Sequence, residues 1–208
     1  MTIALRVAGP GDLDVLTAIM ATAFRNDPVW GEYSYPGSRE RLDTAATVWR
    51  AYLGAPIRHG WSFLSAGGES AAVWVPPGER ELTDEQERAL EALLHELLGE
   101  AQAAIVFDAF ERLDAAHPHH EPHHHLSLFG THEDHRGRGI GMALLDACLE
   151  RVDAAGSPAY LESTNPANER RYMSRGFELF GRVELAGGPV VTTMWRPGRR
   201  LSGPTPAA

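Results

Sequence analysis

The sequence predicts a mixed α/β (α+β) fold in which helices flank a central sheet, and three observations lead to this prediction. Short segments with alternating apolar residues, typical of strands, are interleaved with longer segments of helical periodicity. A glycine-rich turn at residues 135–141 lies between a strand pattern and a long helix pattern. The chain has 208 residues, of which 43% are hydrophobic, enough to bury the core of one domain. We therefore expect one domain over residues 1–197 and a flexible tail over residues 198–208.

The first half of the chain predicts three strands, two helices and one long loop. Asp12 is placed to cap the first helix, because its carboxylate can accept a hydrogen bond from the first turn. The segment 26–37 combines prolines with aromatic residues and is expected to be an irregular loop. Gly67 and Gly68 supply the positive φ angles of a hairpin turn. In chain order we expect a strand at 3–7, a helix at 13–24, the loop, a helix at 42–53, and strands at 61–65 and 70–75.

The second half predicts helices and strands on either side of a histidine-rich stretch. Thr83 and Gln86 form a capping box, and Gly99 breaks the helix that they open. The stretch 116–125 is expected to be a solvated connector without a metal site, although its imidazoles are potential zinc ligands, because adjacent histidines on an extended chain point to opposite sides. The remaining expected elements are a helical pattern through 106–113, a strand at 126–131, a helix at 139–155, a strand at 159–163, a short helix at 166–175, and strands at 177–185 and 190–195.

Composition and charge argue against several classes of protein. The formal net charge of −9 disfavours a nucleic-acid partner, because phosphate binding needs clustered lysine and arginine. The single cysteine, Cys148, permits neither an internal disulfide nor a cysteine-based zinc site, and its helical spacing with Leu145 and Val152 predicts a core position. We see no signal peptide and no apolar stretch of about 20 residues. We expect a cytoplasmic protein with no membrane partner.

The turn at residues 135–141, His-Arg-Gly-Arg-Gly-Ile-Gly, carries the clearest functional pattern. Its glycines allow several backbone N–H groups to turn toward one anion, and the helix that follows adds the positive end of its dipole. The turn lacks the Gly-Lys-Ser/Thr ending of a phosphate loop, and no early βαβ unit of a dinucleotide-binding fold precedes it. The pattern therefore suits a cofactor that carries a pyrophosphate.

Two motifs in the second half resemble one known family. Arg136-x-x-Gly139-x-Gly141 resembles the Gln/Arg-x-x-Gly-x-Gly/Ala signature of the GNAT acetyltransferases, and the pattern from Asn168 through Tyr172 to Gly176-Phe177 resembles their second signature. The runs 158–163 and 187–194, with Ala71-Ala72-Val73-Trp74, extend the resemblance to puromycin N-acetyltransferase-like enzymes of actinobacteria. The resemblance is sharpest from residue 126 to residue 197.

The resemblance implies acetyl-CoA as the cofactor and a sheet that splays where the cofactor binds. In this family the pantetheine arm lies between two strands that diverge, and the pyrophosphate lies on the turn before the long helix. Asn168 is expected to contact the arm or the substrate, while Asn165 caps the short helix ahead of Pro166. The residues implied to bind the cofactor are Phe129, Gly130, Thr131, Arg136, Gly137, Arg138, Gly139, Ile140, Gly141 and Asn168.

Acetyl transfer to an amine needs a proton acceptor for the amine and a proton donor for the departing thiolate. GNAT enzymes often place a tyrosine near the cofactor sulfur, and Tyr172 matches that position. His125 matches the position of the glutamate base in histone-type GNAT enzymes and is expected to titrate near neutral pH, with an ordered water as the alternative base. Glu162 is expected to orient the amine or a water, with an ion pair to an arginine such as Arg171 as the alternative.

The segment 26–37 is also the expected acceptor pocket, because aromatic rings and carboxylates together suit a cationic amine. The expected substrate residues are Trp30, Glu32, Tyr33 and Tyr35, with core packing as the alternative for Trp30. We expect a small-molecule amine as the acceptor, such as an antibiotic or another natural product. A non-catalytic acyl-CoA-binding sensor and an acetyltransferase of a protein or peptide amine are the alternatives, and both a monomer and a homodimer remain open.

Overall fold

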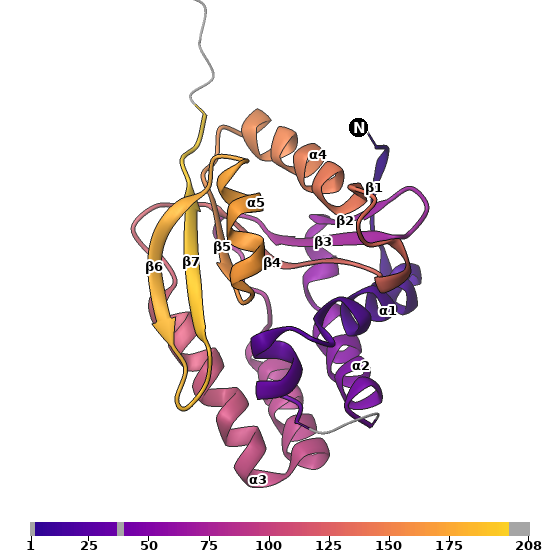
Figure 1. Ribbon diagram of the computed structural model, residues 1–208, viewed down its shortest axis with the longest axis vertical. Coiled ribbons are helices and arrows are strands. Elements are labelled where there is room, and N and C mark those ends of the chain that lie inside the picture. The colour runs from indigo at the N-terminus through magenta and orange to yellow at the C-terminus, as the bar shows by residue number, and fades with distance from the viewer. Residues whose placement is uncertain (1–2, 37–39, 200–208) are drawn as a thin grey trace, which may run out of the picture.

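Among the residues that the computed structural model describes, the central sheet contains seven strands in the order β1-β2-β3-β4-β5-β7-β6 (Figure 1). The structure describes residues 3–36 and 40–199, so most of the predicted tail lies outside the described residues. The parallel pair is β4 and β5, and the other five neighbouring pairs are antiparallel. The strands are β1 (Leu5–Val7), β2 (Ser62–Ser65), β3 (Ser70–Val75), β4 (His124–Thr131), β5 (Ala159–Ser163), β6 (Glu178–Glu184) and β7 (Val190–Arg196).

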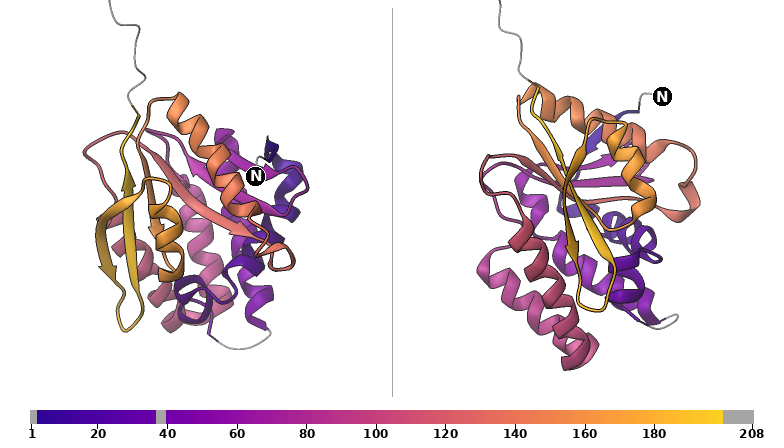
Figure 2. Two further views of the ribbon diagram at one scale, coloured as in Figure 1. Left: turned by 45° about the horizontal axis from the view of Figure 1, so that its top comes forward. Right: turned by 60° about the vertical axis from the view of Figure 1, so that its left-hand side comes forward.

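Helices cover both faces of this sheet, as the sequence predicts (Figures 1 and 2). Because side chains alternate along a strand, Phe63 of β2 packs with α4, whereas its neighbour Leu64 packs with α1 and α2. Within residues 3–36 and 40–199, no helix is both long and apolar enough to cross a membrane. The helices are α1 (Leu13–Phe24), α2 (Glu40–Leu53), α3 (Asp84–Ala116), α4 (Ile140–Ala154) and α5 (Glu169–Met173).

Local signals explain several of these boundaries. Thr83 and Gln86 form the predicted capping box at the start of α3. Gly99 has the non-helical angles φ 73° and ψ 166° and separates α3 into two helical segments at a sharp bend (Figure 2). Asp12 stands before α1, as expected, but its carboxylate does not cap that helix; it binds the Arg6 guanidinium and the Gly9 N–H instead. The ion pair with β1 therefore replaces the predicted cap.

The segment predicted to be an irregular loop contains a π-helical turn at Pro28–Tyr33. Asp27 begins this turn, because its Oδ1 accepts hydrogen bonds from Val29 N at 2.9 Å and Trp30 N at 3.1 Å. Its Oδ2 accepts a third hydrogen bond from Thr164 Oγ1 at 2.7 Å, which ties the turn to the end of β5. The prediction of a loop was wrong here because it ignored the buried cap that a distant residue completes.

The parallel pair β4–β5 splays apart after a short stretch of pairing. The register joins His124 to Ala159 and ends at Leu126 and Leu161, and the two strands then diverge (Figure 1). Ser127 is an extra residue on β4, because β3 pairs with the residues on either side of it. Such a bulge re-aims the residues beyond it. Leu126 therefore packs with α4, whereas Leu128 packs with α1 on the opposite face.

Candidate active site

The turn before α4 has the backbone geometry of an anion site. Gly137 and Gly139 have φ angles of 76° and 77°, a conformation that side chains other than glycine rarely adopt. Gly139 is the N-cap of α4 and offers no side chain to its first turn. The first N–H groups of a helix have no intrahelical acceptors, so those of Ile140 and Gly141 are left for another acceptor. This donor set fits a diphosphate.

Gly141 brings this turn against the open end of β4. A Cβ atom on Gly141 would lie 2.5 Å from Thr131 Oγ1 and 3.4 Å from Phe129 Cζ. Only a residue without a side chain allows the first turn of α4 to come this close to the strand. The structure therefore places Phe129, Thr131 and Gly141 in one location, next to the splay.

The arginines of the turn do not face an open anion site. The Arg136 guanidinium donates to Thr22 O at 2.6 Å and Ala23 O at 3.1 Å, where it satisfies carbonyl groups at the C-terminal end of α1. Arg138 donates to Asp134 O at 3.0 Å. The predicted pyrophosphate contacts of these two residues would come from their backbone, because both guanidinium groups are engaged elsewhere.

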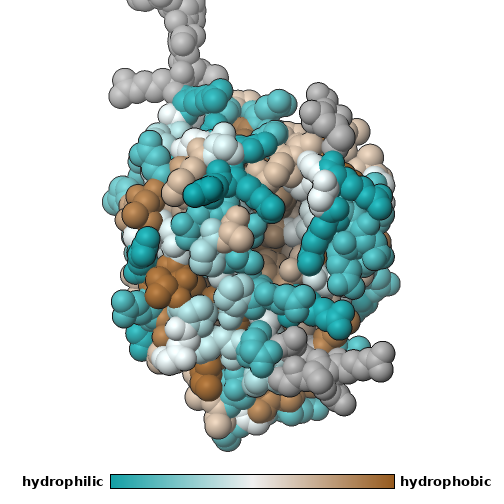
Figure 3. All heavy atoms as spheres, in the orientation of Figure 1, coloured by the Kyte–Doolittle hydropathy of each residue, from teal (hydrophilic) through white to brown (hydrophobic). Residues whose placement is uncertain are grey.

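Tyr172 lies on α5 beside the splay, with its ring centroid 6.5 Å from that of Phe129 and 6.1 Å from that of Phe177. Its side chain is 8% exposed. Burial, and after it the charge of Asp27, raises the pKa of Tyr172, so the phenol keeps its proton at neutral pH. Figure 3 shows a hollow in this face of the molecule, in the region where Figure 1 draws α5 opposite the start of α4.

Asn168 stands at the start of α5, one helical turn before Tyr172. Its Oδ1 accepts a hydrogen bond from Arg171 Nη1 at 3.1 Å. Asn165 Oδ1 accepts one from Ala167 N at 3.0 Å, which confirms the predicted cap ahead of Pro166. Arg171 is therefore engaged by Asn168 and does not form the ion pair that was the alternative for Glu162.

Glu162 pairs with His125 across the splay. His125 Nε2 lies 2.7 Å from Glu162 Oε2, and His125 Nδ1 lies 3.3 Å from Glu81 Oε1. Burial alone would lower the pKa of His125, but the adjacent carboxylates of Glu162 and Glu81 outweigh it and raise that pKa. Burial likewise opposes ionisation of Glu162, but His125 and His117 lower its pKa. The imidazole is thus held protonated at neutral pH, which differs from the near-neutral titration expected from the sequence.

The histidine-rich stretch is not a solvated connector throughout. His123 is 8% exposed and its Nδ1 lies 2.8 Å from Glu121 O. His117 follows α3, and its ring lies 4.9 Å from those of both His123 and His125. The sequence did not predict that His117, His123 and His125 cluster with Glu81 and Glu162, because the two glutamates come from distant segments. A usable signal was the alternation of buried and partly buried residues along β4, which begins at His124, two residues before the predicted strand.

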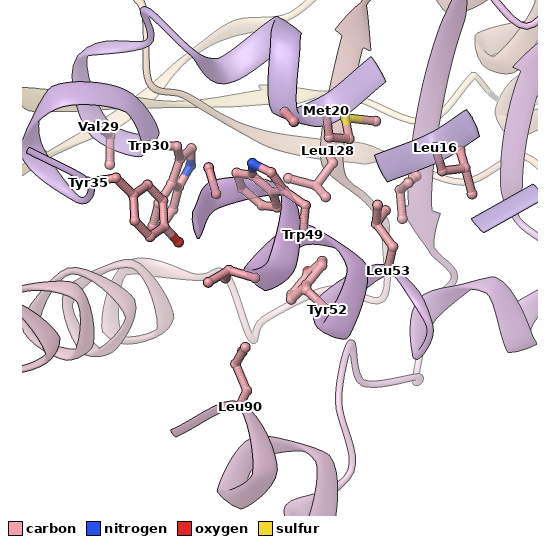
Figure 4. Close-up of a cluster of buried hydrophobic side chains, with 14 of the residues drawn as sticks. Leu16, Met20, Val29, Trp30, Tyr35, Trp49, Tyr52, Leu53, Leu90 and Leu128 are labelled. Carbon is pink, nitrogen blue, oxygen red and sulfur yellow. The ribbon is translucent and has the colours of Figure 1, made fainter. Parts of the chain in front are cut away.

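The four predicted substrate residues do not form one open pocket. Trp30 and Tyr35 are 9% and 2% exposed and lie side by side in the core, where Trp30 contacts Trp49 (Figure 4), as the alternative for Trp30 anticipated. Tyr33 donates from its hydroxyl to Ala186 O in the β6–β7 turn at 3.1 Å. Glu32 is exposed. At this turn, therefore, Tyr33 and Glu32 are accessible at the surface, whereas Trp30 and Tyr35 are buried.

A separate surface hollow of about 810 Å³ lies between α4 and the end of β7. The Arg196 guanidinium in its wall binds both oxygens of Asp153, at 2.6 and 2.8 Å, and also donates to Arg175 O. Arg175 in the same wall binds Asp146, so both pairs of charges are compensated within the hollow. We therefore place the candidate active site at the splay and not in this hollow.

Comparison with known proteins decides the family. Residues 63–177, more than half of the chain, match the model of the acetyltransferase (GNAT) family. The chain belongs to the GNAT family. This GNAT protein is thus an acyltransferase, and its matched segment includes the splay, the turn before α4 and α5.

Solved structures share the GNAT fold at low sequence identity. A Corynebacterium glutamicum protein described as a histone acetyltransferase and related acetyltransferase has a TM-score of 0.67 at 22% identity, over 98% of this chain and all of its own. Drosophila melanogaster polyamine N-acetyltransferase has a TM-score of 0.63 at 16% identity, and the match covers 93% of this chain and 98% of that protein. Aedes aegypti arylalkylamine N-acetyltransferase 2 has a TM-score of 0.64 at 14% identity, over 95% and 99%.

Proposed function

We propose that this GNAT protein transfers the acetyl group of acetyl-CoA to the amine of a small molecule. The observation that carries the proposal is the backbone donor set of Gly137 to Gly141, held against the open end of a splayed strand pair where Phe129 lies near both Gly141 and Tyr172. The N–H groups of the turn would hold the pyrophosphate. Backbone groups of Phe129 to Thr131, on the edge of β4 that β5 leaves, would hold the pantetheine arm.

Acetyl-CoA supplies an acetyl thioester at this site. A C–N bond forms to the neutral amine and the C–S bond breaks, so the leaving thiolate gains one proton and the amine nitrogen loses one. An acceptor that arrives as an ammonium ion loses a further proton to water before it attacks. We assign the first proton to Tyr172, because its raised pKa keeps the phenol in the donor form. Because His125 is held protonated beside Glu162, we assign the proton that the amine loses to a water that the His125–Glu162 pair orients, on the face of the sheet away from α4.

The acceptor is proposed to be a cationic small amine. The carboxylates of Glu81 and Glu162 lie together on the face away from α4, and the chain carries a net charge of −9. The names of the polyamine and arylalkylamine N-acetyltransferases among the structural neighbours are consistent with this class. An antibiotic or another natural product with an amino group belongs to the same class and is the narrower expectation from the motifs.

The test is thiol release from acetyl-CoA by the purified protein with a panel of polyamines, arylalkylamines, aminonucleosides, aminoglycosides and a histone-tail peptide. We expect saturable turnover with a small amine. Turnover of the peptide alone would contradict the proposed acceptor class. If acetyl-CoA raises the melting temperature but no amine is acetylated, the protein is a sensor of acyl-CoA, and if acetyl-CoA does not bind, the proposal fails entirely.

Tyr172→Phe tests the proton donor. The substitution removes only the hydroxyl and keeps the ring contacts with Phe129 and Phe177. We expect kcat to fall by about 10² to 10⁴, the usual contribution of a positioned acid, with the Kd of acetyl-CoA unchanged. Wild-type kcat in a variant that binds acetyl-CoA normally would remove Tyr172 from the mechanism.

A further inference from the structure

Three potential metal ligands from separate elements converge at the head of the splay. His117 follows α3, His125 lies on β4 and Glu162 lies on β5, and one ligand atom of each lies within 4.8 Å of the others. Glu162 Oε2 is 2.7 Å from His125 Nε2, and Glu162 Oε1 is 3.8 Å from His117 Nδ1. We propose that these three side chains bind one divalent transition-metal ion, with zinc as the first candidate.

The ring nitrogens that are not proposed as ligands have hydrogen-bond partners of their own, which leaves the lone pairs of the ligand nitrogens directed toward this site. His123 Nδ1–H donates to Glu121 O at 2.8 Å, so His123 Nε2 is an acceptor. His123 Nε2 lies 3.1 Å from His117 Nε2. His117 Nε2–H can donate to it, which leaves His117 Nδ1 free to bind a metal. The outer nitrogen of His125 lies 3.3 Å from Glu81 Oε1. Metal-binding histidines almost always donate their second N–H to a carboxylate or another acceptor, so this arrangement matches a metal site.

Charge balance and donor type favour a zinc-like ion. One dication compensates the carboxylates of Glu81 and Glu162 and allows all the imidazoles to be neutral. Two imidazoles and one carboxylate suit zinc and other late first-row metals, whereas calcium and magnesium prefer oxygen ligands. A tetrahedral zinc with bonds of about 2.0–2.1 Å separates its ligand atoms by about 3.3 Å, so the three ligand atoms, which already lie within 4.8 Å of one another, need to approach by at most about 1.5 Å.

The site is distinct from nonspecific binding by a histidine-rich stretch. His119 and His120 belong to the same stretch but are exposed, and neither supplies a member of the group. The sequence led us to expect no metal site because Glu162 lies 37 residues beyond His125 and only the sheet brings them together. Zinc would occupy His125 and Glu162, the pair that we propose orients the water that takes the amine proton, so binding would also inhibit acetyl transfer, but the proposed site does not depend on that activity.

The test is a zinc titration of the full chain, made without a polyhistidine tag and treated with a chelator. We expect one equivalent of zinc by calorimetry, and visible absorption typical of tetrahedral cobalt when Co²⁺ is used instead. His117→Gln removes one ligand outside the proposed acetyl-transfer residues and should weaken zinc binding by at least about 100-fold. The matched control His119→Gln should change the Kd by less than about twofold, because that imidazole is outside the group.

Equal effects of His117→Gln and His119→Gln, or several weak equivalents of zinc, would overturn the proposal and indicate adventitious binding by the stretch. No binding by the wild-type chain would overturn it as well. If His117→Gln does not fold, Glu81→Gln serves as the second variant. It keeps all three ligands and should weaken zinc binding by about 10-fold through the hydrogen bond to His125, and an unchanged Kd in that variant would contradict the arrangement.

Discussion

Replacing Gly141 with alanine tests the close contact between α4 and β4 on which the proposed cofactor site depends. Alanine is favoured over glycine within a helix by up to about 1 kcal/mol, so helix propensity alone predicts stabilisation. The new Cβ would lie 2.5 Å from Thr131 Oγ1, however, and such overpacking costs about 1–3 kcal/mol. Thr131 does not turn away freely, because it is branched at Cβ and its Oγ1 lies 3.1 Å from Ser70 Oγ. We expect a net loss of up to about 2 kcal/mol.

Thr131→Ala provides the control that separates the two effects. Without Oγ1, the nearest described neighbour of the new Cβ is Phe129 Cζ at 3.4 Å, an ordinary contact. Gly141→Ala should then be neutral or stabilising, which gives a coupling of about 1–3 kcal/mol in a double-mutant cycle. The free energies of unfolding of the four proteins are measured by urea denaturation. A coupling below about 0.5 kcal/mol would refute the close contact.

Two further predictions concern ion pairs. Asp153→Ala leaves the buried guanidinium of Arg196 without its partner and should lower the free energy of unfolding by about 3 kcal/mol. Asp146→Ala removes the partner of Arg175 at a more exposed pair and should lower it by less than about 1 kcal/mol. Equal losses for the two variants in urea denaturation would contradict this prediction. The Arg6 guanidinium lowers the pKa of Asp12 to about 2 in the folded protein. The ionised carboxylate therefore stabilises the fold fully at pH values above the unfolded pKa of about 4, and this contribution is lost as the pH falls through 2. Asp12→Asn should therefore destabilise the protein at pH 7 by less than about 1 kcal/mol, because the pair is exposed, and a difference that persists at pH 2 would refute the assignment.

The regular elements were predictable because their signals are local. The capping box of Thr83, the break at Gly99 and the turn before α4 depend on residues that are close in sequence, and the structure confirms all three. Asp12 and the segment 26–37 were predicted less well. In each case a partner from another element, the arginine of β1 or Thr164, determines how an aspartate is used.

The sequence by itself determined the mixed fold, the glycine-rich turn that presents backbone N–H groups, and the family to which the chain belongs. The fold and the turn follow from spacing along the chain, because helix periodicity, strand alternation and positive φ angles are properties of neighbouring residues, whereas the family follows from the resemblance of the motifs at 136–141 and 168–177 to known signatures. The tertiary structure alone decided that Arg136 binds the end of α1 and that His117, His125 and Glu162 meet at the splay. The bulge at Ser127 and the divergence of β4 from β5 control which side chains face each other there. Contacts between side chains from distant segments depend on sheet register and packing, and neither can be read from the spacing of residues along the chain.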